Sequence, residues 1–204
     1  PGGVSADGLY SYNSQGIRSP VPAYATKPPV GVLRIALFGD SFTHGDDVPV
    51  GDSWGAVLES HLNRNGVPAE VLNFGVGGYG IDQALLRYTQ QGKSFAPDLV
   101  ILGFASENLK RILNLVRPLY DPRSGLPFAK PRFILTDRGI DLINVPVLPP
   151  DRMVATLRDF DAWELRPHEY FYDPADFQAS WWQHSKLLGT VYDMKVSRED
   201  RWLL

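Results

Sequence analysis

The sequence contains no cysteine, which excludes disulfide bonds, thiolate metal sites and a cysteine nucleophile. It also lacks any apolar run close to the roughly 20 residues that a membrane-spanning helix needs. Its 20 lysines and arginines are outnumbered by 23 aspartates and glutamates, so no basic field attracts a phosphate backbone. We therefore expect no membrane span in this chain and no nucleic-acid partner. Exported and cytoplasmic locations, and any oligomeric state, are all compatible with this composition.

Metal ligands and cofactor motifs are also sparse. The four histidines and the carboxylates are scattered rather than spaced as metal ligands, so we expect no metal and no cofactor. Residues 75–80 formally match the Gly-x-Gly-x-x-Gly dinucleotide fingerprint, with Asp98 at about the expected distance. However, Asp98 directly precedes a predicted strand, whereas a ribose-binding acid follows one. This placement argues against a nucleotide site.

What is present indicates a single globular domain of the α/β class. With 44% hydrophobic and 21% charged residues, the chain is able to bury a sizeable core. Residues 1–31 are rich in Pro, Gly, Ser and Tyr without sustained periodicity, which predicts an irregular N-terminal arm packed over the surface. We expect residues 32–116 to form the core, 117–184 an insertion within the same domain, and 185–204 an incomplete return to the core.

The predicted core alternates strands and helices. Apolar runs at residues 33–38, 71–74 and 99–102 indicate three buried strands. Ser53 is placed to cap one helix, Asn65-Gly66 to end it, and residues 82–91 form a second. Right-handed crossovers would make the strands parallel. The expected fold is therefore a flavodoxin-like three-layer α/β/α domain with a parallel central sheet.

The insertion combines a hairpin with an aromatic stretch. Residues 133–136 and 140–143 flank a predicted three-residue turn at 137–139. Further along, aromatic side chains either pack the insertion onto the core or line a groove for an extended ligand, and packing is the favoured interpretation. They are Trp163, Tyr170, Phe171, Tyr172, Trp181 and Trp182.

Three polar blocks follow the three predicted strands, and parallel strands would bring them to one edge of the sheet. The first, Gly-Asp-Ser-Phe-Thr-His-Gly at residues 39–45, presents Ser41 where a buried strand turns, as a serine nucleophile requires. It could equally be an ordinary turn. The glycine-rich block at 73–80 can aim backbone N–H groups at a developing negative charge. In the third, at 103–108, the Asn108 amide offers another donor.

Together, these blocks resemble the SGNH/GDSL hydrolase superfamily over about residues 13–108. The resemblance includes an Asn-x-x-Gly-x-Arg lead-in from Asn13 and the Pro-Asp-Leu-Val of residues 97–100. It implies that Ser41 is the nucleophile and that its backbone N–H contributes to an oxyanion hole. Gly78 would add a backbone N–H, and Asn108 a side-chain amide.

The chain departs from the superfamily pattern in two places. In the third block, Ser106 stands where the pattern has glycine, and Leu109 where it has aspartate. The Asp-x-x-His block that supplies the base and its orienting acid is not found. His44, His61, His168 and His184 are each weak candidates for a substitute base. We expect instead that the chain, which also lacks an initiator methionine, is truncated before its catalytic histidine.

These observations predict serine-dependent hydrolysis of a carboxylic ester, including O-acetyl groups on carbohydrate, through an acyl-enzyme. The substrate would be a small-molecule or carbohydrate ester. Transfer of the acyl group to a sugar hydroxyl is the alternative within enzymes, since an alcohol can resolve the same intermediate. A non-catalytic carbohydrate-binding module on the same scaffold is the alternative from another class.

Overall fold

The structure is a computed structural model that describes residues 2–5 and 8–174. The chain divides into one unit of residues Pro1–Phe171 and a second of Tyr172–Leu204. The strands of the first unit are β1 (Gly3–Val4), β2 (Ser11–Tyr12), β3 (Leu33–Phe38), β4 (Ala69–Asn73), β5 (Leu99–Leu102), β6 (Arg132–Thr136) and β7 (Gly139–Ile143). Its α-helices are α1 (Ser41–His44), α2 (Trp54–Arg64), α3 (Ile81–Gln90), α4 (Glu107–Arg111), α5 (Arg117–Tyr120) and α6 (Pro150–Arg158). Short 3₁₀ turns are η1 (Val50–Asp52), η2 (Gly92–Phe95), η3 (Pro122–Ser124), η4 (Phe160–Ala162) and η5 (Arg166–His168).

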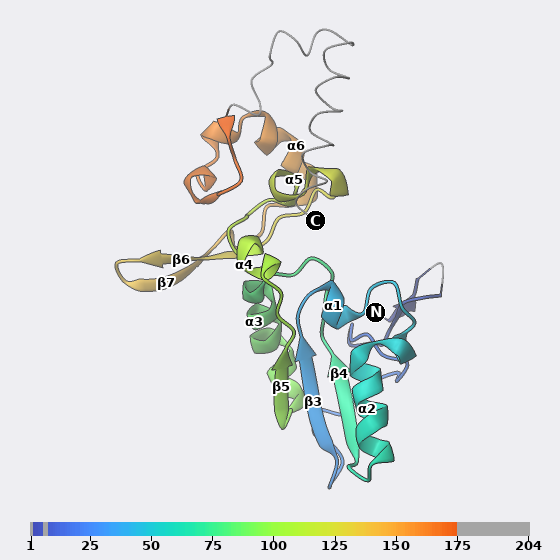
Figure 1. Ribbon diagram of the computed structural model, residues 1–204. Helices are drawn as coiled ribbons and strands as arrows, with labels where there is room; N and C mark the ends of the chain where they lie inside the picture. Colours follow the sequence, from blue (N-terminus) through green and yellow to red (C-terminus); the bar gives the residue numbers. More distant parts are fainter. Residues whose placement is uncertain (1, 6–7, 175–204) are drawn as a thin grey trace. The chain divides into compact units, whose positions relative to one another are not determined.

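The central sheet has the order β4-β3-β5, and both neighbours run parallel to β3 (Figure 1). This confirms the predicted α/β class with a parallel central sheet, consistent with a flavodoxin-like fold. The apolar run of β3 is buried because side chains pack on both of its faces. On β5, by contrast, Leu99, Val100 and Leu102 remain substantially exposed.

Two apolar clusters cover the two faces of the sheet. On one face, Phe38 and Phe74 stack at a centroid separation of 4.9 Å, and α3 and η2 pack over them. On the other face, Ile35, Leu37 and Val71 pack against α2. The β-strand alternation of side chains separates these clusters, so the sheet is the middle of three layers (Figure 1).

The helix signals of the sequence hold closely. The Ser53 side chain caps α2 by accepting a hydrogen bond from the Ala56 N–H, and Gly66 follows the helix with φ of +77°. Helix α3 begins at Ile81, one residue before the predicted start. Gly55 lets α2 approach the sheet, because a Cβ there would lie 2.6 Å from Leu37 Cδ1. Local sequence therefore sets both the ends and the closeness of this layer.

The N-terminal arm contributes buried side chains to the core, whereas the sequence predicted an arm packed over the surface. Strands β1 and β2 form a short antiparallel pair, and Ile17 is fully buried in the cluster over Phe38. Arg18 is also buried, and its guanidinium donates to the carbonyls of His44, Gly45 and Val48. The arm therefore supports the chain that follows Ser41, which a composition rich in turn-forming residues does not reveal.

The segment after α4 contains the expected hairpin, but its turn differs from the prediction. Thr136 pairs with Gly139, so the turn has two central residues rather than three. Glycine at position 139 has φ of +121°, which lets the second strand start immediately. Aromatic side chains of the predicted stretch make ring contacts within the segment: Trp163 with Phe160, Phe171 with Tyr120, and Tyr170 with Phe171.

Some predicted features lie outside the described residues: Trp181, Trp182 and the expected return to the core at 185–204. Within the described ranges, no helix is long and apolar enough to cross a membrane.

Candidate active site

Ser41 follows the turn after β3 and is the first residue of helix α1. Asp40 caps this helix, because its Oδ1 accepts a hydrogen bond of 3.1 Å from the Phe42 N–H. Gly39 has φ of +155°, and a Cβ there would lie 2.8 Å from the carbonyl oxygen of Gly103. The turn therefore needs glycine, and it leaves Ser41 half-buried with a backbone N–H that has no partner among the described residues.

The glycine-rich block after β4 lies against α1. Asn73 connects them, since its Nδ2 donates 2.8 Å to the Thr43 carbonyl while its Oδ1 accepts from the Gly75 N–H at 2.9 Å. Gly78 has φ of +78°, a conformation that favours glycine. In the described part of the chain its backbone N–H, like that of Ser41, has no hydrogen-bond partner.

Asn108, at the start of α4, connects all three blocks. Its Nδ2 donates to Asp40 Oδ2 at 2.9 Å and to the Tyr79 carbonyl at 3.2 Å, and its side chain is buried. Because Asp40 adjoins Ser41 and Tyr79 adjoins Gly78, the sequence neighbours of two predicted residues meet at the third, Asn108. The convergence expected from parallel strands is therefore present at the carboxyl end of the sheet.

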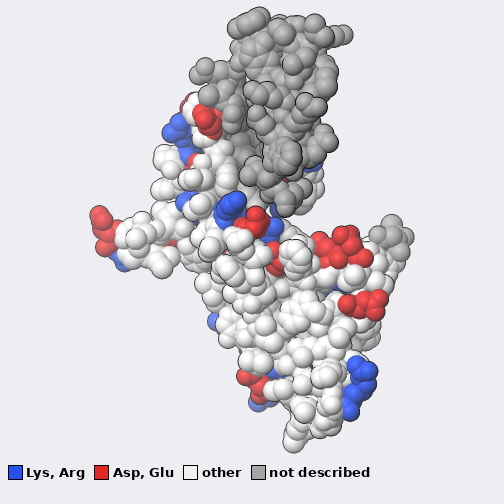
Figure 2. Space-filling view, viewed as in Figure 1, with Lys and Arg blue, Asp and Glu red and all other residues white. Residues whose placement is uncertain are grey.

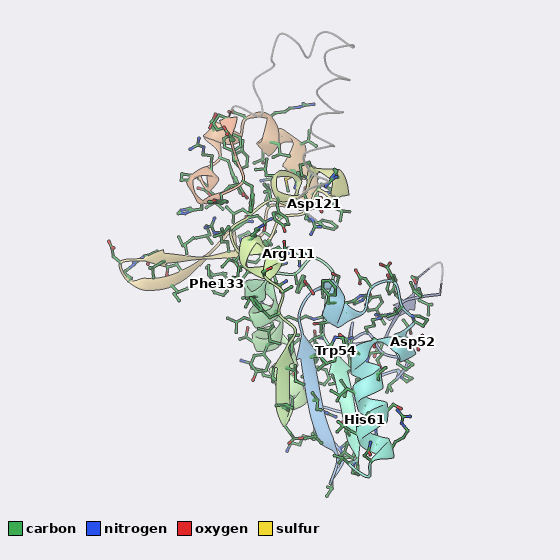
Figure 3. The ribbon with its side chains drawn as sticks, in the orientation of Figure 1. Asp52, Trp54, His61, Arg111, Asp121 and Phe133 are labelled. Atoms are coloured by element: carbon green, nitrogen blue, oxygen red, sulfur yellow. The ribbon has the colours of Figure 1, made fainter. Side chains whose placement is uncertain are left out.

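Arg111 is a site residue that the sequence reasoning missed. Its Nη1 donates to the same two oxygens as Asn108, Asp40 Oδ2 at 2.9 Å and the Tyr79 carbonyl at 3.2 Å. A signal existed, because residues three apart on a helix share a face, and Arg111 is three residues after Asn108. Figure 3 shows it on α4, where the chain leaves the sheet.

A family model described as the GDSL-like lipase/acylhydrolase family matches residues 37–163, more than half of the chain. The chain belongs to this family. Its matched region contains the last two residues of β3, the Ser41 turn, the glycine-rich block and α4.

Two solved structures of the esterase AlinE4 are similar to this GDSL-like chain. A point mutant has 30% identity over 43% of this chain and 47% of its own, with a TM-score of 0.35. AlinE4, described as an SGNH-hydrolase family esterase, has 17% identity over 84% of this chain and 98% of its own, with a TM-score of 0.34. The chain thus spans about half the length of the first relative, at 47%. No curated protein matches it.

His44, the histidine nearest to Ser41 in sequence, has both ring nitrogens occupied. Nδ1 pairs with the Asp46 carboxylate and Nε2 lies 2.6 Å from the Tyr12 hydroxyl. A carboxylate only accepts, so Nδ1 donates, and in the neutral ring Nε2 accepts from Tyr12. Burial lowers the pKa of His44, against an opposing effect of the Asp46 hydrogen bond. The ring is therefore a buried neutral support for the segment after Ser41.

The other three histidines of this GDSL-like chain are distant from Ser41 in the sequence. His61 is exposed on α2, well separated from Arg111 (Figure 3). His168 lies in η5, and its carbonyl accepts a hydrogen bond from Arg132. His184 lies outside the described residues. Among the histidines that are described, none has its ring hydrogen-bonded to Ser41.

The acid of the formal nucleotide fingerprint also has a structural partner. Asp98 lies directly before β5, and its Oδ2 accepts a hydrogen bond of 2.8 Å from the Arg34 N–H. It is therefore at the opposite end of the strand from the glycine-rich block.

Proposed function

We propose that the chain carries the nucleophile and oxyanion hole of a carboxylic ester hydrolase, with Ser41 attacking the acyl carbon. The observation that carries this is the pair of unpartnered backbone N–H groups on Ser41 and Gly78, within the described residues, in blocks linked through Asp40, Asn108 and Tyr79. Such donors stabilise the charge of a tetrahedral intermediate, typically by a factor of about 10²–10³ in rate for each donor.

Asn108 is the third donor in this proposal, and its role depends on Arg111. Both amide hydrogens of Asn108 are engaged, so the amide must release one acceptor to reach an oxyanion. Arg111 donates to the same two oxygens, so it would keep both of them hydrogen-bonded when Asn108 releases one. In this scheme, Arg111 is a positioning residue and Asn108 the donor.

Activation of Ser41 requires a base within hydrogen-bond reach. The proposal places that base outside the described residues, as His184 or as a histidine beyond this sequence. Hydrolysis of O-acetyl groups on carbohydrate and transfer of the acyl group to a sugar hydroxyl both proceed from the same acyl-enzyme. The reaction is hydrolysis when water attacks this intermediate and acyl transfer when a sugar hydroxyl does.

The test is hydrolysis of p-nitrophenyl acetate by the natural full-length protein and its Ser41→Ala variant. We expect kcat/KM to fall by about 10³-fold or more, since the residual rate of a serine hydrolase without its nucleophile is small. Ser60→Ala, an exposed serine on α2, is the matched control and should retain the activity. Turnover unchanged by Ser41→Ala would overturn the proposal. Absent turnover would also overturn it, and would favour a non-catalytic binding module.

A further inference from the structure

A cavity of about 230 Å³ lies next to the proposed oxyanion hole, and its walls carry three cations. Gly78 and Tyr79 form one side, and Arg111, Arg117 and Lys130 contribute positive charge. Tyr120 and Phe128 add aromatic surface to the same cavity. On the face shown in Figure 2, basic and acidic side chains lie beside one another over α4. The cavity therefore combines apolar surface with several hydrogen-bond donors.

Each cation already has one carboxylate partner. Arg111 pairs with Asp40 at 2.9 Å, Arg117 with Asp121 at 2.7 Å, and Lys130 with Asp82. None of these three aspartates is among the residues that line the cavity. Lys130 is buried and donates to the Asp82 carboxylate and to the Pro131 carbonyl, so it is largely used for structure.

The two arginines keep unused donors. A guanidinium has five N–H groups. Arg111 donates through Nη1 alone and Arg117 through Nη2 alone, within the part of the chain that the structure describes. The Arg117 Nη1 group lies directly against Gly78, where an added Cβ would collide with it. A free guanidinium nitrogen therefore adjoins Gly78, the residue whose backbone N–H is proposed for the oxyanion hole.

We propose that this cavity binds the carboxylate of an acidic ester substrate, with Arg117 Nη1 as the main donor. A carboxylate accepts hydrogen bonds without needing to donate, which fits a wall that offers N–H groups, and charge-assisted pairs with arginine are strong. The aromatic side chains would contact an apolar part of the same substrate. This inference rests on the proposed function, because it places the carboxylate beside the ester that Ser41 attacks.

The direct test is calorimetric binding of benzoate and of benzamide, its neutral counterpart, to the natural full-length protein. We expect benzoate to bind at least tenfold more tightly, and Arg117→Gln to remove that difference. Arg138→Gln, at the exposed hairpin turn, should leave it intact. Equal affinity for the two probes, or a benzoate preference that survives Arg117→Gln, would overturn the inference.

A second variant covers the case in which Arg117→Gln does not fold. Asp121→Asn removes the carboxylate that competes for Arg117, so benzoate should bind more tightly than to the unchanged protein. Unchanged or weaker benzoate binding by this variant would also overturn the inference.

Kinetics separate this inference from the proposed function. For phenyl acetate and 4-acetoxybenzoate, Arg117→Gln should lower the ratio of kcat/KM values, acidic over neutral, at least tenfold. If Ser41→Ala abolishes both activities but Arg117→Gln leaves the ratio unchanged, only the carboxylate site is refuted. If benzoate binding depends on Arg117 but hydrolysis does not depend on Ser41, the proposed function fails and the anion site stands.

Discussion

The sheet core and the segment after α4 differ in how their buried side chains are arranged, because the core has an apolar cluster on each face of its sheet. In the core, Phe38, Leu72 and Phe74 are almost completely buried on one sheet face, and α3 covers them. In residues 112–171, the buried side chains include polar groups as well as a few apolar ones. Glu169, for example, accepts hydrogen bonds from the backbone N–H groups of Val116 and Phe171 at 3.1 and 2.9 Å.

The contrast extends to the connection between the two regions. Lys130 lies in the later segment and Asp82 on α3, and both side chains are buried where they form an ion pair. Meanwhile the hairpin leaves Leu135 and Ile140 largely exposed. Removing a buried apolar side chain leaves a cavity, whereas removing one partner of a buried polar contact leaves the other partner unsatisfied. The two regions should therefore respond differently to substitution.

The largest expected effect is in the core. Phe38→Ala should lower the free energy of unfolding by about 4 kcal/mol, because it removes a buried ring that stacks on Phe74 and meets Tyr88 edge-on. Urea denaturation measures this. Leu135→Ala is the large-to-small control in the later segment, and we expect a change within about 0.5 kcal/mol because that side chain is exposed. Equal losses in the two variants would erase the contrast.

Next in size is the ion pair between the regions. Lys130→Met should cost about 3 kcal/mol, since it leaves the Asp82 carboxylate buried without its partner. Adding Asp82→Leu should recover most of the loss, because a buried ion pair can be replaced by apolar side chains at little cost. Urea denaturation of both variants checks this. A double variant no more stable than Lys130→Met would show that the region depends on something other than this pair.

The smallest expected effect concerns His44, a polar group within the core region. Its pKa is lowered from 6.5, so the unfolded chain binds the proton more readily than the folded one. Stability should be full above about pH 6.5 and should fall as the pH drops below that value. His44→Gln should flatten this pH dependence of the urea midpoint, and His61→Gln, on an exposed histidine, should not. A slope unaffected by His44→Gln would contradict the assignment.

The core could be predicted because its physics is local and periodic. Continuous apolar runs produced the three strands, and Ser53 and Gly66 marked the ends of α2 through capping chemistry. The order of the three blocks along parallel strands also indicated that Ser41 and Asn108 would be brought to one end of the sheet. These inferences needed only short stretches of sequence.

The remainder could not be read locally, because it depends on side chains that are distant in sequence. Nothing around Arg18 indicates that it is buried against the carbonyls of Gly45 and Val48. Similarly, the three-residue turn predicted for the hairpin was wrong because strand pairing starts at Gly139 itself. Glu169 and Lys130 look like ordinary surface charges in the sequence, yet both are buried.

The sequence by itself determined the parallel α/β core and the position of Ser41 after the first strand of that core. It also determined that one polar block follows each of the three strands. Spacing and periodicity encode these features directly. Only the tertiary structure decided that Asn108 and Arg111 share the Asp40 and Tyr79 oxygens, and that Arg117 approaches Gly78. Those contacts join residues tens of positions apart, and only the packing of α4 and α5 beside the sheet end fixes which donors are used and which stay free.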